Sequence, residues 1–144
     1  MKKELCTDLY ELTMGQTYFD NGEVEDKACF DVFFRTNPFN GNYTVSGGLD
    51  EVIDYVKNLK FDSEDIEYLR SLNLFSDEYL EYLSNFKFTG DIYAVEDGTI
   101  IFPNEPIITV VAPKIEAQIL ETTLLTLFNY GSLITTKAAR LTEA

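Results

Sequence analysis

The sequence predicts an α+β fold, in which helices pack on a small, mainly antiparallel sheet. Apolar residues recur at helical spacing in five segments, and a period of two replaces that spacing in two others. The chain has 144 residues, of which 45% are hydrophobic, and this is enough for one domain over residues 1–144 with a real core. The predicted helices are 7–19, 49–59, 63–72, 76–86 and 115–144, and the β-rich regions are 28–35 and 90–113.

The first predicted helix is amphipathic on two faces. Its core stripe is Leu5, Leu9, Leu12 and Phe19, and its second stripe is Tyr10, Met14 and Tyr18. Asp8 with Glu11, or Thr7 alone, supplies the N-terminal cap, and Asn21 with Gly22 ends the helix. By periodicity, the tyrosines are either half-buried core residues or face another chain or a ligand.

The β-rich regions alternate with turn signals. Residues 28–35 read as a strand with Phe30, Val32 and Phe34 on one side, and residues 43–45 as a short strand. Residues 46–48, Ser-Gly-Gly, open the next helix, where they either cradle an anion on bare N–H groups or cap the helix and allow close packing. Residues 90–113 hold three β-rich runs.

The last predicted helix, about 115–144, is the longest. Its apolar face is Ile119, Leu120, Leu124, Leu127 and Phe128. Gly131 and Ser132 are expected to interrupt it, because glycine weakens a helix interior. The helical pattern reaches the last residues without a cap, which predicts that the polypeptide is part of something longer.

Charge and composition exclude several classes of function. The net charge is −14, and such a surface repels phosphate backbones, so neither nucleic acid nor an anionic membrane is an expected partner. No apolar run approaches the roughly 20 residues that cross a bilayer, and no signal peptide is recognisable, so a cytoplasmic location is expected. Cys6 and Cys29 are expected to be reduced.

The chain contains no histidine. Without histidine or a Cys-x-x-Cys motif no metal site is expected, and neither a Ser/His nor a Cys/His nucleophile pair can form. We therefore expect no catalytic residue in this chain and no complete enzyme. Arg35, Arg70 and Arg140 are the only arginines, so candidates for bidentate phosphate contacts are few.

Several stretches are characteristic when they are taken together and in order. They are Thr-Asp-Leu-Tyr-Glu-Leu-Thr-Met (7–14), Phe-Phe-Arg-Thr-Asn-Pro-Phe (33–39), Gly-Gly-Leu (47–49), Glu-Asp-Gly-Thr-Ile-Ile-Phe-Pro-Asn-Glu-Pro-Ile (96–107), Glu-Thr-Thr-Leu-Leu (121–125) and Asn-Tyr-Gly-Ser-Leu-Ile-Thr-Thr-Lys-Ala-Ala-Arg-Leu (129–141). The chain closely resembles the N-terminal domain of nicotinate phosphoribosyltransferase, a type II phosphoribosyltransferase. The resemblance implies that the last helix leads toward a C-terminal α/β barrel, which these residues lack.

The resemblance implies an enzyme of NAD salvage, in which nicotinate and phosphoribosyl pyrophosphate form nicotinate mononucleotide with ATP hydrolysis. Such an enzyme is a glycosyltransferase and is also classed as a ligase. ATP and Mg are the implied cofactors, and neither is expected to bind this part alone. Members of the family commonly work as head-to-tail dimers with the active site at the subunit interface, so a homodimer is expected.

The same resemblance assigns candidate substrate-binding residues. Tyr10 stacks its ring on nicotinate in the partner subunit's barrel. Asp8 orders this site or is only a helix cap, and Arg35 contacts the phosphates of phosphoribosyl pyrophosphate or forms only a surface ion pair. Lys137 and Arg140 are expected to be structural. The family's phosphorylated histidine and phosphate-binding loops belong to the barrel, so this chain alone is expected to be inactive.

Two alternatives stay open at this point. In the first, the chain is a non-catalytic assembly or binding subunit that completes an active site on a separate barrel chain. In the second, it belongs to a nicotinamide or quinolinate phosphoribosyltransferase, because the residues that recognise the carboxylate of the substrate lie in the barrel.

Overall fold

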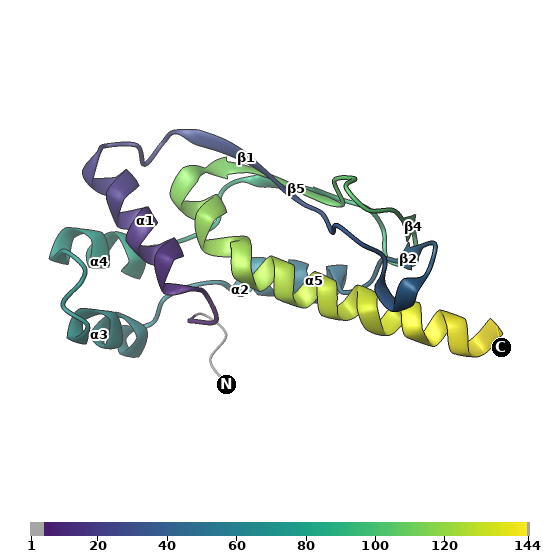
Figure 1. Cartoon of the computed structure of the whole chain (residues 1–144). Coiled ribbons are helices and arrows are strands. Elements are labelled where there is room, and N and C mark those ends of the chain that lie inside the picture. The colour runs from purple at the N-terminus through teal and green to yellow at the C-terminus, as the bar shows by residue number, and fades with distance from the viewer. Residues whose placement is uncertain (1–4, 144) are drawn as a thin grey trace.

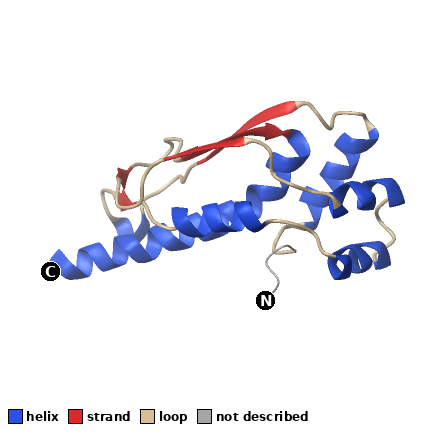
Figure 2. Ribbon diagram, turned by 180° about the vertical axis from the view of Figure 1, so that it is seen from behind, coloured by secondary structure: helices blue, strands red, loops and turns tan. Residues whose placement is uncertain are grey.

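The computed structural model describes residues 5–143 and has the predicted α+β fold, with helices packed on small antiparallel sheets. The three-stranded sheet lies over the long last helix in Figure 1, and Figure 2 shows the same layers from behind. In chain order the elements are α1 (Leu9–Asp20), β1 (Lys27–Val32), the 3-10 helix η1 (Pro38–Asn40), β2 (Thr44–Val45), α2 (Leu49–Asn58), α3 (Ser63–Ser71), α4 (Asp77–Ser84), β3 (Asp91–Ala94), β4 (Ile100–Ile101), β5 (Ile108–Pro113) and α5 (Lys114–Glu143).

β5 is the central strand of the larger sheet. It pairs antiparallel with β1 on one side and with β3 on the other. Ile108, Val110 and Ala112 alternate along β5 and are buried, as the period of two requires for a face that covers a core. A separate two-stranded sheet joins β2 to β4. The predicted strand at 28–35 ends earlier, at Val32, although the Asn104 N–H still donates to the Phe34 carbonyl at 2.8 Å.

α5 underlies this sheet and supplies the largest share of the core. Ile119, Leu120, Leu124 and Phe128 are almost fully buried, as the helical spacing predicts. The expected interruption at Gly131 and Ser132 is wrong, because α5 is continuous through both residues. Gly131 is instead a point of close packing, since a Cβ there would lie 2.5 Å from the carbonyl oxygen of Gly47.

Polar side chains of α5 complete this close contact. The Gly47 N–H donates to the Ser132 hydroxyl at 3.1 Å, and the Val45 N–H donates to the Thr136 hydroxyl at 2.8 Å. The Leu49 N–H, at the start of α2, donates to the Asp97 carboxylate at 3.2 Å. These backbone donors are therefore already bonded within the domain, so the close-packing interpretation of residues 46–48 holds and the anion cradle does not.

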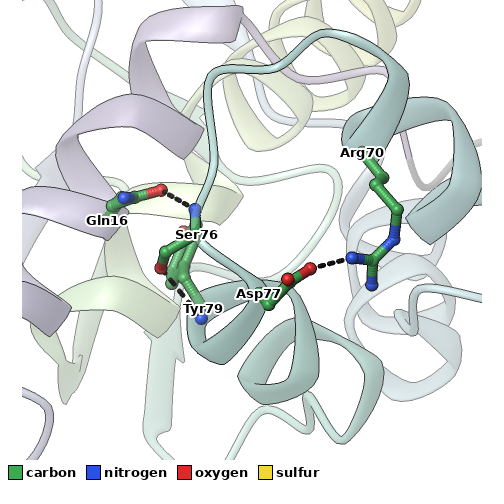
Figure 3. A network of polar contacts seen from close by, with 5 residues as sticks. All are labelled: Gln16, Arg70, Ser76, Asp77 and Tyr79. Atoms are coloured by element: carbon green, nitrogen blue, oxygen red, sulfur yellow. Dashed lines mark hydrogen bonds and ion pairs between the residues drawn. The ribbon is translucent and has the colours of Figure 1, made fainter.

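The helices α1, α3 and α4 gather at one end of the domain, around Tyr79 of α4 (Figure 1). This side chain is fully buried and lies in a cluster of rings with Phe19, Phe75 and Tyr82. Figure 3 shows how α1 reaches this cluster: the Gln16 side chain accepts a hydrogen bond from the Ser76 N–H at 3.1 Å.

Polar contacts also fix the starts of the two short helices. The Ser76 hydroxyl caps α4 by accepting from the Tyr79 N–H, as predicted. Asp62 and Asp65 form a capping box at the start of α3. Arg70 of α3 forms an ion pair with Asp77 of α4, which is drawn in Figure 3.

Substitution of Gly131 by alanine tests the close contact between α5 and residues 47–48. Alanine raises helix propensity, yet its Cβ would meet the Gly47 carbonyl, so we expect the free energy of unfolding to fall by about 1–3 kcal/mol. Thr126→Ala, at an exposed position of the same helix, is the matched control and should change stability by no more than about 0.5 kcal/mol. Urea denaturation of the three chains measures the difference. Equal stability of the two variants would contradict the close packing.

Candidate functional site

The candidate site lies where the N-terminal turn of α1 meets α5. Asp8 and Glu11 both contact Thr122 of α5, and Tyr10 contacts the neighbouring Glu121. The first turn of α1 therefore meets two adjacent residues of α5. These contacts determine the position of the Tyr10 side chain on the surface.

Glu11 is the most deeply buried residue of this contact, with none of its surface exposed. Its Oε1 accepts hydrogen bonds from the Thr122 N–H at 2.8 Å and from the Thr122 hydroxyl at 2.5 Å. Its Oε2 is buried without a hydrogen-bond partner. Burial raises the pKa of Glu11 to about 7, with a smaller contribution from the charges of Glu121 and Asp8, although the bonds from Thr122 oppose this shift.

The burial of Glu11 against Thr122 was not predicted, because the sequence pattern placed Glu11 in the N-terminal cap. The residue lies one position before Leu12 and four before Gly15, and both of these are buried, so it belongs to the core face of α1. A Cβ on Gly15 would lie 2.3 Å from the Tyr79 hydroxyl oxygen, which shows how closely this face packs. Glu11 and Gly15 are one helical turn apart, and this spacing is the sequence signal that could have indicated that Glu11 is buried.

Asp8 occupies the N-cap position of α1, but its side chain makes no capping hydrogen bond. It accepts instead from the Thr122 hydroxyl at 3.1 Å. Asp8 is therefore at the predicted N-cap position, but the predicted hydrogen bond from its side chain to the helix backbone is absent. The predicted core stripe is also wrong at Leu9, which is 49% exposed, whereas Leu12 is 3% exposed as expected. Glu11 takes the buried place that Leu9 was expected to share.

Tyr10 is 43% exposed, so it is not a core tyrosine. Partial burial and a hydrogen bond with the Glu121 carboxylate raise its pKa to about 12. Met14 of the same predicted stripe is exposed, and Tyr18 is half-buried below the Lys114 ammonium, which lies 5.6 Å from the ring centroid. A tethered hydroxyl and an accessible ring suit Tyr10 for stacking on a flat ligand.

Arg35 lies beyond the end of β1 and is exposed. Within residues 5–143 its guanidinium forms no ion pair. It lines a hollow of about 560 Å³ together with Phe33, Asn129 and Glu121. Glu121 thus lines the same hollow as Arg35 and also lies beside Tyr10.

Lys137 and Arg140 hold the loop before β2, as the expected structural role requires. The Lys137 ammonium lies 4.8 Å from the ring centroid of Phe39. The Arg140 guanidinium donates to the Tyr43 carbonyl at 3.3 Å and lies 5.6 Å from the Tyr43 ring centroid. Phe39 has a positive φ of 59°, and these cations pack against the loop where its backbone is strained.

Residues 5–143 contain no group of three or more Cys, Asp or Glu side chains that could hold a metal ion. No helix in the described part of the chain is long and apolar enough to cross a bilayer.

Comparison with known proteins gives consistent matches. The family model described as nicotinate phosphoribosyltransferase (NAPRTase) N-terminal domain matches residues 5–129. A nicotinate phosphoribosyltransferase of Mycobacterium tuberculosis (strain H37Rv), pncB2, is 44% identical over 140 residues, which cover 97% of this chain and 30% of that protein. The nicotinate phosphoribosyltransferase of Bacillus subtilis (strain 168) is 45% identical over 137 residues, covering 95% of this chain and 28% of that protein.

A solved structure agrees with these relatives. The crystal structure of human nicotinic acid phosphoribosyltransferase matches with a TM-score of 0.88 at 34% identity, covering 95% of this chain and 28% of that chain. The chain thus spans less than a third of the length of the relatives it matches.

The raised pKa of Glu11 predicts a pH dependence of stability. Between about pH 4.5 and 7 the folded chain retains a proton that the unfolded chain releases, so the contribution of Glu11 to the free energy of unfolding falls as pH rises. Glu11→Gln keeps an oxygen acceptor for Thr122 and carries no charge. We expect the stability of this variant relative to the native chain to rise by roughly 2–3 kcal/mol from pH 4.5 to 7.5. Urea denaturation across this range measures it, and a constant difference would refute the assignment.

Proposed function

The chain belongs to the nicotinate phosphoribosyltransferase (NAPRTase) N-terminal domain family, and from this premise we propose that it is the N-terminal part of an enzyme of NAD salvage. That enzyme forms nicotinate mononucleotide from nicotinate and phosphoribosyl pyrophosphate. The ring nitrogen of nicotinate bonds to C1 of the ribose as pyrophosphate leaves, and ATP hydrolysis drives the reaction. ATP and Mg bind outside residues 5–143, and the enzyme works in the cytoplasm as a homodimer.

Tyr10 carries this proposal. Its ring is accessible and its hydroxyl lies beside Glu121 of α5, so it offers an aromatic face to a neighbouring subunit. Nicotinate bound in the partner subunit's barrel stacks on this face, and the ring is thereby held flat for attack. Exposed Leu9 lies next to Tyr10 and extends the apolar surface that such a subunit would cover.

Arg35 and Asp8 have separate parts in the proposed site. The guanidinium of Arg35, which has no ion-pair partner within residues 5–143, binds a phosphate group of phosphoribosyl pyrophosphate. Asp8 accepts from Thr122 and so helps to hold the first turn of α1. Neither residue transfers a proton in this scheme, and the 144-residue chain alone is inactive.

A chimera tests the proposal directly. Residues 1–144 replace the matching segment of the Bacillus subtilis relative, and product is measured with nicotinate, nicotinamide or quinolinate, each with and without ATP. We expect ATP-stimulated formation of nicotinate mononucleotide by the chimera and none by the 144-residue chain. Activity of the short chain would contradict its expected inactivity, and preference for another pyridine would assign the alternative substrate. A folded but inactive chimera would refute the proposal.

Substitution of Tyr10 in this chimera separates the ring from its hydroxyl. Tyr10→Ala removes the stacking surface, and we expect the KM for nicotinate to rise about tenfold, which corresponds to about 1.4 kcal/mol. Tyr10→Phe keeps the ring and should change that KM less than about threefold. Tyr68→Ala removes an exposed tyrosine on α3 and is the matched control. Steady-state kinetics would exclude stacking if Tyr10→Ala behaved as the control does.

Substitution of Arg35 tests the phosphate contact. Arg35→Gln removes a charged donor, so the KM for phosphoribosyl pyrophosphate should rise about tenfold or more while the KM for nicotinate stays within about twofold. Arg70→Gln breaks the ion pair with Asp77 between α3 and α4 and is the control. An equal effect of both variants, measured by the same kinetics, would assign Arg35 a role in surface charge only.

A further inference from the structure

We infer that Glu11 and Thr122 form a latch that positions Tyr10 for nicotinate. They are positioning residues rather than catalytic residues, because neither is placed against the substrate. This inference rests on the proposed function and extends it from the stacking ring to the contact between helices that orients the ring.

The latch joins adjacent residues on both helices. Glu11 follows Tyr10 in α1, and Thr122 follows Glu121 in α5. The Glu11 carboxylate binds the backbone and the side chain of Thr122 together, and the Tyr10 hydroxyl bonds to Glu121. A shift of Glu11 against Thr122 therefore also shifts Tyr10 against Glu121. Asp8 lies 3.1 Å from the same Thr122 hydroxyl and shares its single proton with Glu11, so the first turn of α1 contacts Thr122 on both sides of Tyr10.

The hydrogen bond from the Thr122 N–H to Glu11 comes from a donor in the interior of a helix. The Thr122 N–H lies well inside α5, where the N–H of a regular helix donates to the carbonyl four residues earlier, here Gln118. In this structure it donates to the Glu11 carboxylate at 2.8 Å. Figure 1 shows the first turns of α5 running at an angle to the rest of the helix.

The latch requires an acceptor at position 11 but not a negative charge. Both hydrogen bonds from Thr122 end on Oε1, and Oε2 has no partner. A glutamine oxygen can accept the same two bonds, whereas alanine can accept neither. Glu11→Gln and Glu11→Ala therefore separate positioning from electrostatics.

The fold offers a matched control. Glu116 of α5 is 6% exposed and accepts from the Thr89 N–H at 2.6 Å and from the Thr89 hydroxyl at 2.9 Å. It repeats the chemistry of the Glu11–Thr122 pair in a different place, beside Tyr82. Loss of this second pair should lower stability without moving Tyr10.

The experiment measures kcat, both KM values and Tm in the chimera for Glu11→Ala, Glu11→Gln, Thr122→Val and Glu116→Ala. We expect Glu11→Ala to raise the KM for nicotinate at least fivefold with the KM for phosphoribosyl pyrophosphate unchanged, and Glu11→Gln to stay within about twofold of the native residue. Thr122→Val loses the hydroxyl contacts to Glu11 and Asp8 but keeps the backbone bond to Glu11, so it should give a smaller rise. Glu116→Ala should lower Tm and leave both KM values unchanged. If Glu11→Ala lowered Tm without changing the KM for nicotinate, the latch would be structural only.

A second measurement does not depend on activity. In the 144-residue chain with 13C-labelled tyrosine rings, Tyr10→Phe identifies the NMR signal of Tyr10 at pH 7. We expect that signal to move toward the position of a solvent-exposed tyrosine in Glu11→Ala and to stay in place in Glu11→Gln and Glu116→Ala. An unmoved signal in Glu11→Ala would overturn the inference. An inactive native chimera with the expected NMR shifts would refute the proposed function and leave the helix contact established.

Discussion

The packing of α5 is the constraint on which the rest of the structure depends. α1, α2, β1, β2 and β5 all contact this one helix, which lies under the three-stranded sheet and continues beyond it (Figure 1). The apolar residues of α5 from Ile115 to Phe128 contribute to the core. Two further contacts are polar or backbone to backbone, because Thr122 binds Glu11 and Gly131 lies against Gly47. The position of α1, and hence of Tyr10, follows from the first of these contacts.

The elements that periodicity predicts correctly are those whose stability comes from one buried face. β5 alternates strictly and α4 buries Leu80 and Leu83, so their patterns carry enough information by themselves. The expected break at Gly131 fails for the opposite reason. Helix propensity disfavours glycine there, but the neighbouring backbone at Gly47 requires it, and that contact joins residues 84 positions apart that no local pattern connects.

In the candidate site too, some features could be predicted from local spacing and others depend on contacts between distant residues. The outward position of Tyr10 could be expected from the second stripe of α1 together with the family resemblance, and Tyr10 is indeed accessible. The burial of Glu11 could not be expected from spacing alone, because a carboxylate on a core face is costly unless it is hydrogen-bonded. Its donors are the N–H and hydroxyl of Thr122, more than a hundred residues later in the chain. Recognition of the buried glutamate therefore required the helix–helix contact itself.

The charge around Tyr10 gives this contact a further consequence. Asp8, Glu11 and Glu121 are three carboxyl groups beside one tyrosine, in a chain of net charge −14, whereas both proposed substrates are anions. A fully ionised cluster would repel them. With its pKa raised to about 7, Glu11 is partly protonated near neutral pH, so burial reduces the local negative charge without removing the acceptor that holds Thr122. Arg35, across the hollow lined by Glu121, adds a positive charge on the same side. Burial of one carboxyl group thus fixes the helix contact and makes the surface around Tyr10 less repulsive to an anionic pyridine.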